Sequence, residues 1–269
     1  MQIDFKQYGK WSPSPLQYPG SKFRLAKKIL PYFPENPEVM YSPFIGGGAI
    51  EIMIQDLGIE VIGSDIDPRL VNFYKWVKRE PESISDYALT LAPMANLEAR
   101  RKYLKEFRET KLDDTLEYTQ KYYVANRISF SGNCSYAGTN FLYIGATNHF
   151  NRDWSEALRY FYAPNLSVVC QDFRDFISRI AQDDFIYLDP PYVLGKSQLY
   201  GIGYKDNHTK FDHQLLRNLL ETKNNWVLSY NDCEYIRRLY SGYRMVELER
   251  NKSFNDNSKN GIEILILSQ

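Results

Sequence analysis

The sequence predicts an α/β protein built on a doubly wound sheet, in which strands alternate with helices and a helical insertion interrupts the alternation. Three observations support this fold class. Short apolar runs alternate with longer amphipathic runs. A triple glycine at residues 46–48 separates the first predicted strand from the first long helix. Polar side chains directly follow several strands, where ligands bind in sheets of this kind.

Composition limits the class of protein. The chain has 269 residues, of which 33 are Lys or Arg and 33 are Asp or Glu, so its total charge gives no argument for a polyanionic partner. Three widely spaced cysteines suggest reduced thiols. No Cys–His cluster has zinc spacing, and no apolar run has the length of a signal peptide or membrane span. We therefore expect a cytoplasmic protein with no metal and no membrane contact.

The first predicted crossover has the features of a nucleotide-binding turn. A strand at residues 39–45 runs into the triple glycine, and a helix begins at residue 49. Glycines let a ligand approach the backbone closely at a helix N-terminus. The glycine pattern is neither that of a dinucleotide pyrophosphate site nor that of a P-loop.

Two further features accompany this turn. The strand at residues 60–65 ends in Asp65, about 20 residues beyond the glycines, at the spacing where a carboxylate accepts from ribose hydroxyls. Upstream, a turn at residues 18–22 precedes a helix at residues 23–30. A lysine in the first turn opposes the helix dipole, so Lys22 is either a solvated surface residue or the partner of an anionic ligand group.

A mainly helical insertion follows at residues 80–165, which divides the α/β domain into residues 1–79 and 166–269. Amphipathic helices are predicted at residues 97–107 and 116–124, where interleaved acids and bases indicate a salt-bridged surface. Residues 126–143 are instead rich in Asn, Ser, Gly and aromatic residues. Such side chains read base edges and phosphates, and a long loop in a compact domain is more often functional than filler.

The alternation resumes after the insertion. Strands are predicted at residues 166–171, 185–188 and 226–230, each followed by a helix, and residues 243–248 and 261–267 form a closing pair. The polar loop at residues 195–210 suits a lid over a site. We expect five residues to converge on one edge of the sheet, because all follow strand carboxyl ends: Gly46, Asp65, Asp172, Asp189 and Asn231.

The candidate chemistry lies in Asp189-Pro190-Pro191-Tyr192, directly after a buried strand. Two prolines stiffen the backbone, stop strand pairing and remove two N–H donors, which leaves carbonyl groups free to accept. The carboxylate also accepts, and the aromatic ring offers a flat face. Together these groups can hold a planar amine by its two hydrogens, although a strand end with a proline-rich turn is the plain alternative.

Taken in order, four pieces of the chain resemble the motifs of Dam-type adenine-specific DNA methyltransferases. They are Tyr18-Pro19-Gly20-Ser21-Lys22, Pro43-Phe44-Ile45-Gly46-Gly47-Gly48, Asp65 and Asp189-Pro190-Pro191-Tyr192. The resemblance covers nearly the whole chain. It implies a class I S-adenosylmethionine-dependent methyltransferase fold, with a mixed seven-stranded sheet whose seventh strand is antiparallel and lies between the fifth and sixth. It also implies that residues 80–165 form the DNA target-recognition domain.

The resemblance implies a cofactor site, carried over residue by residue. Tyr18 and Lys22 would bind the methionine end of S-adenosylmethionine, where Lys22 meets the carboxylate. The turn from Phe44 through Gly46 to Gly48 would pass under the methionine moiety. The other expected contacts are Asp65 to the ribose hydroxyls, Asp172 and Phe173 to the cofactor adenine, and Asp189, which belongs to both the cofactor and the catalytic sites.

The implied mechanism follows from the chemistry of adenine. Its amino group is a poor nucleophile because the nitrogen lone pair is delocalised into the ring. Asp189 and the Pro190 carbonyl would accept its two N–H bonds and favour a pyramidal nitrogen, while Tyr192 stacks on the base. A base inside a duplex is out of reach, so the adenine must be flipped out. Neither a metal nor a covalent enzyme intermediate is required.

Double-stranded DNA is the implied partner, together with a cognate restriction endonuclease if the enzyme belongs to a restriction–modification pair. Arg127, Ser129, Ser131 and Asn133 are candidates for DNA contact, since the corresponding stretch reads DNA in relatives. Here that stretch departs from the family's usual run, so the resemblance does not establish the family's GATC sequence as the target. A C-terminal loop adds candidate phosphate contacts at Lys252, Asn255, Asn257 and Lys259.

Three alternatives explain part of the pattern. A methylase of the cytosine amino group shares the fold and mechanism, but its tetrapeptide usually begins with Ser. A dinucleotide-dependent oxidoreductase would use the glycine turn and Asp65, but leaves Lys22 and the tetrapeptide unexplained. A non-catalytic DNA-binding relative is disfavoured because Asp189 and Tyr192 are intact.

Overall fold

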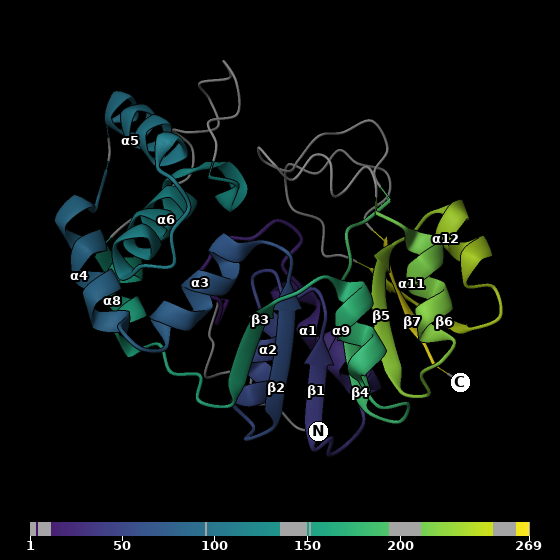
Figure 1. The fold of residues 1–269 in the computed structure, drawn as a ribbon. Coiled ribbons are helices and arrows are strands. Elements are labelled where there is room, and N and C mark those ends of the chain that lie inside the picture. The colour runs from purple at the N-terminus through teal and green to yellow at the C-terminus, as the bar shows by residue number, and fades with distance from the viewer. Residues whose placement is uncertain are drawn as a thin grey trace.

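The computed structural model describes residues 4, 12–94, 96–134, 150, 152–193, 211–249 and 262–268. Within these residues the strands form one seven-stranded sheet, in the order β3-β2-β1-β4-β5-β7-β6 (Figure 1). Neighbouring strands are parallel except β7, which is antiparallel to β5 and β6. The strands are β1 Val39–Ser42, β2 Glu60–Asp65, β3 Leu166–Cys170, β4 Phe185–Leu188, β5 Trp226–Asn231, β6 Arg244–Glu249 and β7 Ile262–Leu267.

This topology confirms the predicted fold class. The chain builds outward from β1 through β2 to β3, then returns to place β4 on the other side of β1. The seventh strand lies between β5 and β6 and is antiparallel, as the resemblance implied. The strand order therefore reverses between β1 and β4, which is where open α/β sheets bind their ligands.

The alternation of side chains along the strands assigns helices to the two faces of the sheet. In β4, Phe185 and Tyr187 belong to one buried cluster, and Ile186 and Leu188 belong to the other. Successive strand side chains point to opposite faces, so one short strand supports both cores. The first cluster includes side chains of α1 Ala26–Ile29, α2 Ala49–Gln55 and α3 Pro68–Val77; the second includes those of α9 Phe173–Arg179, α11 His213–Leu220 and α12 Glu234–Leu239.

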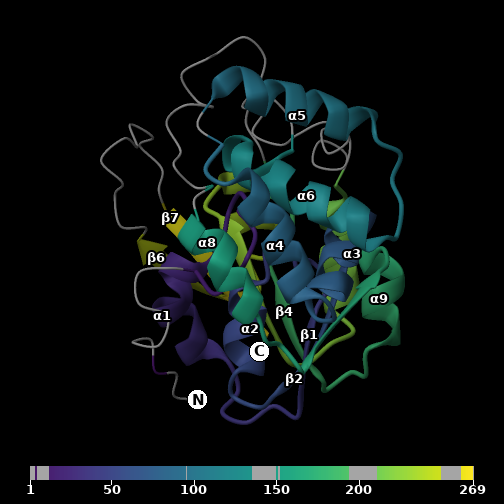
Figure 2. The same cartoon turned by 90° about the vertical axis from the view of Figure 1, so that its left-hand side faces the viewer.

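The insertion forms a helical bundle that packs beside α3 (Figures 1 and 2). Asn96 caps α5 (Leu97–Glu109) and Thr115 caps α6 (Leu116–Ile128), each by accepting hydrogen bonds from backbone N–H groups of the first turn. The ring of Phe73 in α3 stacks on Tyr123 in α6, with centroids 6.0 Å apart, so the insertion shares the core of the sheet. The helices are α4 Pro81–Leu91, α5 Leu97–Glu109, α6 Leu116–Ile128 and α8 Arg152–Ala157.

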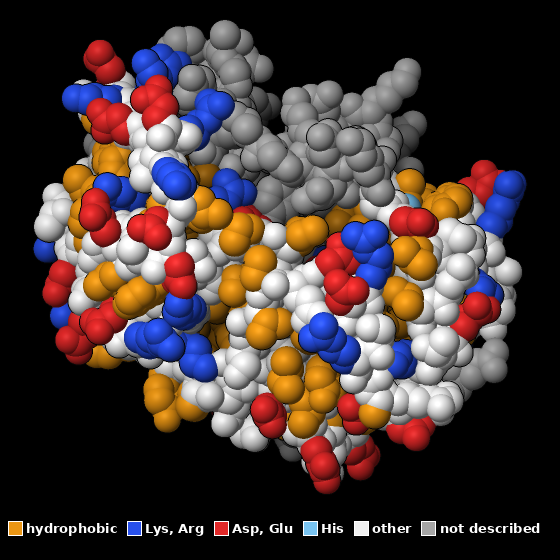
Figure 3. All heavy atoms as spheres, viewed as in Figure 1, with side chains coloured by type: hydrophobic (Ala, Val, Ile, Leu, Met, Phe, Trp, Pro, Cys, Tyr) orange, Lys and Arg blue, Asp and Glu red, His pale blue; other side chains and the backbone are white. Residues whose placement is uncertain are grey.

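The surface carries acidic and basic side chains that are intermingled on the face shown in Figure 3, in agreement with the balanced composition. Among the described residues, no helix combines the length and apolarity needed to cross a membrane. The same residues contain no group of three or more His, Cys, Asp or Glu side chains arranged to hold a metal ion.

Candidate active site

A cavity of about 530 Å³ opens at the carboxyl edge of the sheet. Four of the five residues predicted to meet at this edge border it: Gly46, Asp65, Asp172 and Asp189. The fifth, Asn231, instead donates a hydrogen bond to the Val193 carbonyl at 3.2 Å, which ties β5 to the segment after the tetrapeptide. The strand ends thus bring together segments that are far apart in the sequence.

The three glycines of the turn leave room for the ring of Tyr18. A Cβ atom at Gly46 would lie 2.7 Å from the Tyr18 ring, and one at Gly47 would lie 2.7 Å from the Tyr18 Cβ. Gly48 has a φ of +63° and faces the Tyr74 hydroxyl. Side chains at these positions would displace Tyr18 and Tyr74, so three glycines in succession have a packing reason that the sequence did not reveal.

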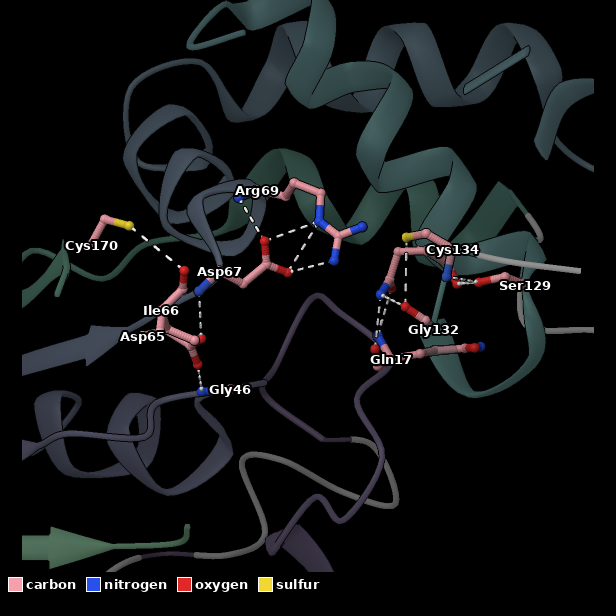
Figure 4. A network of polar contacts seen from close by, with 11 residues as sticks. Gln17, Gly46, Asp65, Ile66, Asp67, Arg69, Ser129, Gly132, Cys134 and Cys170 are labelled. Atoms are coloured by element: carbon pink, nitrogen blue, oxygen red, sulfur yellow. Dashed lines mark hydrogen bonds and ion pairs between the residues drawn. The ribbon is translucent and has the colours of Figure 1, made fainter. Parts of the chain in front are cut away.

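Asp65 closes the end of β2 against the glycine turn (Figure 4). Its carboxylate accepts from the backbone N–H of Gly46 at 3.2 Å and from that of Asp67 at 2.9 Å. Burial raises the pKa of Asp65 to about 6. Asp67 caps α3 and pairs with Arg69. Asp65 is therefore held rigidly at the cavity wall, where it was predicted to accept from ribose hydroxyls.

Three aromatic rings gather on another wall of the cavity. Phe44 and Phe173 lie 5.4 Å apart between ring centroids, and Phe211 lies within 5.6 Å of both. Asp172 caps α9 through the Arg174 N–H and pairs with the Arg174 guanidinium. The predicted positions Phe44, Asp172 and Phe173 are brought together, and Phe211 is an addition that sequence reasoning missed.

An ion pair between Lys22 and Asp189 borders the cavity. The Lys22 ammonium donates to Asp189 Oδ2 at 2.6 Å and to the Gly20 carbonyl at 2.8 Å. It also lies 4.8 Å from the centroid of the Tyr192 ring. Lys22 is only 4% exposed, so the interpretation of this lysine as a solvated surface residue is wrong.

The environment of Asp189 changes its protonation. Burial raises the pKa of this carboxyl group to about 6, and the nearby Glu263 carboxylate acts in the same direction. The Lys22 ammonium acts in the opposite direction. At neutral pH the group is therefore ionised and can accept hydrogen bonds, yet it is more basic than a solvated aspartate.

The tetrapeptide lies beyond the end of β4, because prolines cannot donate the hydrogen bonds that continue a strand. β4 ends at Leu188, Pro190 is buried and Pro191 is half-buried. The Tyr192 hydroxyl donates a hydrogen bond to Glu263 in β7. The four residues that were predicted to be catalytic thus lie at the cavity wall, and the hydroxyl of the Tyr192 ring is bound to strand β7.

Two buried acids near Asp189 escaped the sequence reasoning. Glu51 in α2 is 3% exposed, accepts from the Ser42 hydroxyl at 2.6 Å, and has its pKa raised by burial to about 7. Glu263 in β7 is fully buried. Each is the only acid in an otherwise apolar run, which is the signal that could have identified both.

The charged, polar and aromatic side chains that border the cavity fit S-adenosylmethionine, the cofactor that the resemblance implies. In the described ranges, five acidic side chains border the cavity against two basic ones, Lys22 and Arg174, which suits a ligand with an ammonium and a sulfonium group. The buried Tyr187 hydroxyl also borders the cavity and has no hydrogen-bond partner in the described part of the chain. The aromatic wall offers rings to a purine.

Two of the predicted DNA-contact residues make internal contacts. Arg127 is 3% exposed; it donates to the Pro15 carbonyl and lies 4.4 Å from the centroid of the Trp154 ring. Ser129 is 1% exposed and accepts from the Cys134 N–H (Figure 4). Either side chain would have to leave these partners to touch DNA, because a buried group cannot reach a phosphate or base edge.

The other DNA candidates have different surroundings. Ser131 and Asn133 are half-buried after the end of α6, and Asn133 borders a second cavity of about 340 Å³ together with Lys105 and Arg108. The predicted lid at residues 195–210 lies outside the described residues. So do the four candidate phosphate contacts Lys252, Asn255, Asn257 and Lys259.

The chain is similar in sequence to known proteins over nearly its whole length. A family model described as D12 class N6 adenine-specific DNA methyltransferase matches residues 18–254. The chain is 27% identical over 263 residues to the DNA adenine methylase of Haemophilus influenzae, which covers 93% of this chain and 90% of that protein. It is 25% identical over 255 residues to the DNA adenine methylase of Vibrio cholerae, with 90% of each chain covered. It is 26% identical over 265 residues to the retron Ec67 DNA adenine methylase of Escherichia coli, covering 94% of this chain and 90% of that one.

Proposed function

Because the chain belongs to the D12 class of N6 adenine-specific DNA methyltransferases, we propose that its carboxyl-edge cavity holds S-adenosylmethionine beside a flipped-out adenine of duplex DNA. The enzyme transfers a methyl group from S-adenosylmethionine to adenine in DNA. That specificity leaves the alternatives of cytosine methylation and of a dinucleotide-dependent oxidoreductase without support.

One observation carries the assignment of the catalytic residues. Asp189 follows β4 at the switch point of the sheet, and its carboxylate lies in the cavity beside the Tyr192 ring. Hydrogen-bond acceptors and a flat aromatic surface are what a purine amino group needs for orientation. We assign the amine acceptors as Asp189 and the Pro190 carbonyl, with Pro191 as the stiffening residue and Tyr192 as the stacking surface.

The chain's own residues would activate the amine by orientation and charge. Two acceptors at the N–H bonds favour a pyramidal nitrogen whose lone pair points away from them. When bound, S-adenosylmethionine supplies an electrophilic methyl group on a sulfonium. The raised pKa of Asp189 also makes its carboxylate a better acceptor for the proton that the methylated amine gives up.

Lys22 has to change its partner before the base can enter. Its ammonium now lies against Asp189 and over the Tyr192 ring, where the adenine would be held. A cofactor carboxylate near Lys22 would compete for the ammonium, which leaves Asp189 open to the amine. Tyr18 lies against the glycine turn beside this point, so we place the methionine end of the cofactor between Tyr18, Lys22 and Gly46–Gly48.

The insertion is our proposed DNA-recognition domain. Lys105 and Arg108 of α5 are exposed and border the second cavity with Asn133. Cationic side chains beside a polar amide suit a phosphate backbone better than an apolar partner. We place the reaction in the cytoplasm of a bacterial or phage-infected cell, where DNA and cofactor meet; in a restriction–modification pair, the partner would be an endonuclease that the same methyl group blocks.

A direct test is single-molecule sequencing of DNA from a methylation-free bacterial host that expresses this chain. We expect methyl-adenine in one short motif, and none in a host that expresses Asp189→Ala. The matched control is Glu234→Gln, which changes an exposed acid of α12, outside the insertion, and should leave the methylation pattern intact. Methylation that persists in Asp189→Ala would remove Asp189 from the mechanism.

A further inference from the structure

Glu263 is a buried acid in an otherwise apolar strand. It lies in β7 between apolar neighbours, and its side chain is fully buried. Taking a carboxylate out of water costs free energy unless hydrogen bonds and opposite charges replace the lost solvent. The position of this acid therefore has to be explained by its partners.

Those partners come from three separate parts of the site. The Tyr192 hydroxyl donates to Glu263 Oε1, and the Ser229 hydroxyl of β5 donates to the same oxygen at 2.5 Å. The Lys22 ammonium lies 3.8 Å from it. One carboxylate thus contacts the stacking residue, the neighbouring strand and the lysine that pairs with Asp189.

The sheet gives this carboxylate its position. β7 runs antiparallel beside β5, in a register that sets Glu263 opposite Asn231 at the carboxyl end of β5. Strand backbones in the middle of a packed sheet are held by hydrogen bonds on both sides, so an acid there is a fixed anchor. The tetrapeptide, by contrast, follows its strand as a turn without sheet pairing.

Resting on the function proposed above, we propose that Glu263 is a positioning residue that holds the Tyr192 ring, through its hydroxyl, at the angle needed to stack on the target adenine. A hydrogen bond to an acceptor that is fixed within the sheet favours one orientation of the ring that donates it. Without the bond the ring can turn about its side-chain torsions, and the base would be held in several orientations. Methyl transfer is sensitive to such misplacement, because its rate depends on in-line geometry.

The test is a double-mutant cycle between Glu263→Gln and Tyr192→Phe. Phenylalanine keeps the ring and removes the hydroxyl, and glutamine keeps the shape but replaces the carboxyl group that accepts the bond with an amide. In the Tyr192 background we expect Glu263→Gln to lower kcat by about tenfold, with the dissociation constant for S-adenosylmethionine changed less than about threefold. In the Tyr192→Phe background the same substitution should lower kcat by less than about threefold, since no hydroxyl remains to be held.

A purely structural role would give a different result. An equal loss of kcat in both backgrounds would overturn the proposal, as would an unchanged kcat in Glu263→Gln. Glu247→Gln is the matched control, because the exposed Glu247 lies in the adjacent strand β6 and pairs with the half-buried Arg237. It should leave kcat unchanged.

A second readout separates this proposal from the proposed function. The same four proteins are unfolded in urea without DNA or cofactor. Their free energies of unfolding, obtained from the midpoints, give the coupling free energy between Tyr192 and Glu263. If the two substitutions are coupled in stability but the unsubstituted chain does not methylate DNA, the proposed function is wrong while the Tyr192–Glu263 hydrogen bond is supported. Uncoupled midpoints would overturn the positioning proposal, whatever the activity.

Discussion

The Lys22 ammonium and the Asp189 carboxylate lie 2.6 Å apart, although 167 residues separate them in the chain. Lys22 also lies over the face of Tyr192. In the mechanism proposed above, the amine of a target adenine binds the same carboxylate and its ring stacks on the same face. Lys22 and the substrate amine therefore compete for one place, and the next two predictions follow from this competition.

The rate of methylation should fall in acid as Asp189 takes up a proton. Burial raises the pKa of Asp189 to about 6, so its carboxylate is ionised above that pH and neutral below it. A protonated carboxyl group is a poorer acceptor for the amine. We expect kcat/KM, measured between pH 5 and pH 8, to be level above about pH 7 and to drop about tenfold per pH unit well below 6. A rate that stays level down to pH 5 would contradict this role.

Replacing Lys22 by methionine should shift the fall of kcat/KM on the acid side (the acid limb) to higher pH. The ammonium lowers the pKa of Asp189, so its removal lets the pKa rise. We also expect kcat/KM at pH 8 to fall by about tenfold or more, because the cofactor carboxylate loses its proposed partner. Lys28→Met is the control, since Lys28 is exposed and donates to the Glu249 backbone carbonyl. An unmoved acid limb would assign it to another group, such as Asp65.

Glu51→Gln should stabilise the fold at high pH and not at low pH. The folded state raises the pKa of Glu51 from 4.5 to about 7, so the fold favours the protonated acid. The stability that this preference provides is present below about pH 4.5 and is lost as the pH rises through 7. We expect Glu51→Gln to raise the free energy of unfolding at pH 8 by about 3 kcal/mol and to change it little at pH 4.5.

Urea unfolding at the two pH values measures this difference. Glu156→Gln serves as the control, because Glu156 is exposed in α8 and should give the same small change at both pH values. A Glu51→Gln variant that is destabilised at pH 8 would show that the ionised carboxylate, held by Ser42, supports the fold.

Gly132→Ala should destabilise the junction between the N-terminal segment and the insertion. A Cβ atom at Gly132 would lie 2.0 Å from the Gln17 carbonyl oxygen, and the φ of this residue is +73°. Asn126 binds both Gln17 and Gly132, so the junction cannot widen without losing these bonds. We expect a loss of about 3 kcal/mol in urea unfolding, against less than about 1 kcal/mol for Gly242→Ala, whose added Cβ atom would have no atom of the described residues within 4 Å. Equal effects would refute the close contact.

Lys105 and Arg108 should contribute to DNA affinity through phosphates. Neutralising each with glutamine should weaken binding to any duplex sequence and reduce the slope of log K against log salt by about one. Fluorescence anisotropy at several salt concentrations measures both quantities. Arg238→Gln is the control, because Arg238 is exposed in α12 and pairs with Glu234 one turn earlier. Unchanged salt slopes would move the DNA interface away from this part of the insertion.

The sequence by itself determined the fold class, the helical insertion and the tetrapeptide at the end of β4. These follow from short-range patterns: alternation within strands, helical spacing, and prolines that stop a strand. It also placed Gly46, Asp65, Asp172 and Asp189 at the cavity, because parallel strands bring their carboxyl ends to one edge.

Only the tertiary structure decided which side chains meet there. The sequence left open whether Lys22 is a surface residue, and the structure shows it buried against Asp189. Arg127, which we predicted to contact DNA, lies over Trp154 in the interior. Glu263 contacts Tyr192 from 71 residues away because β7 enters the sheet beside β5. Such contacts depend on strand order and register, which long-range packing sets and which no local pattern of residues encodes.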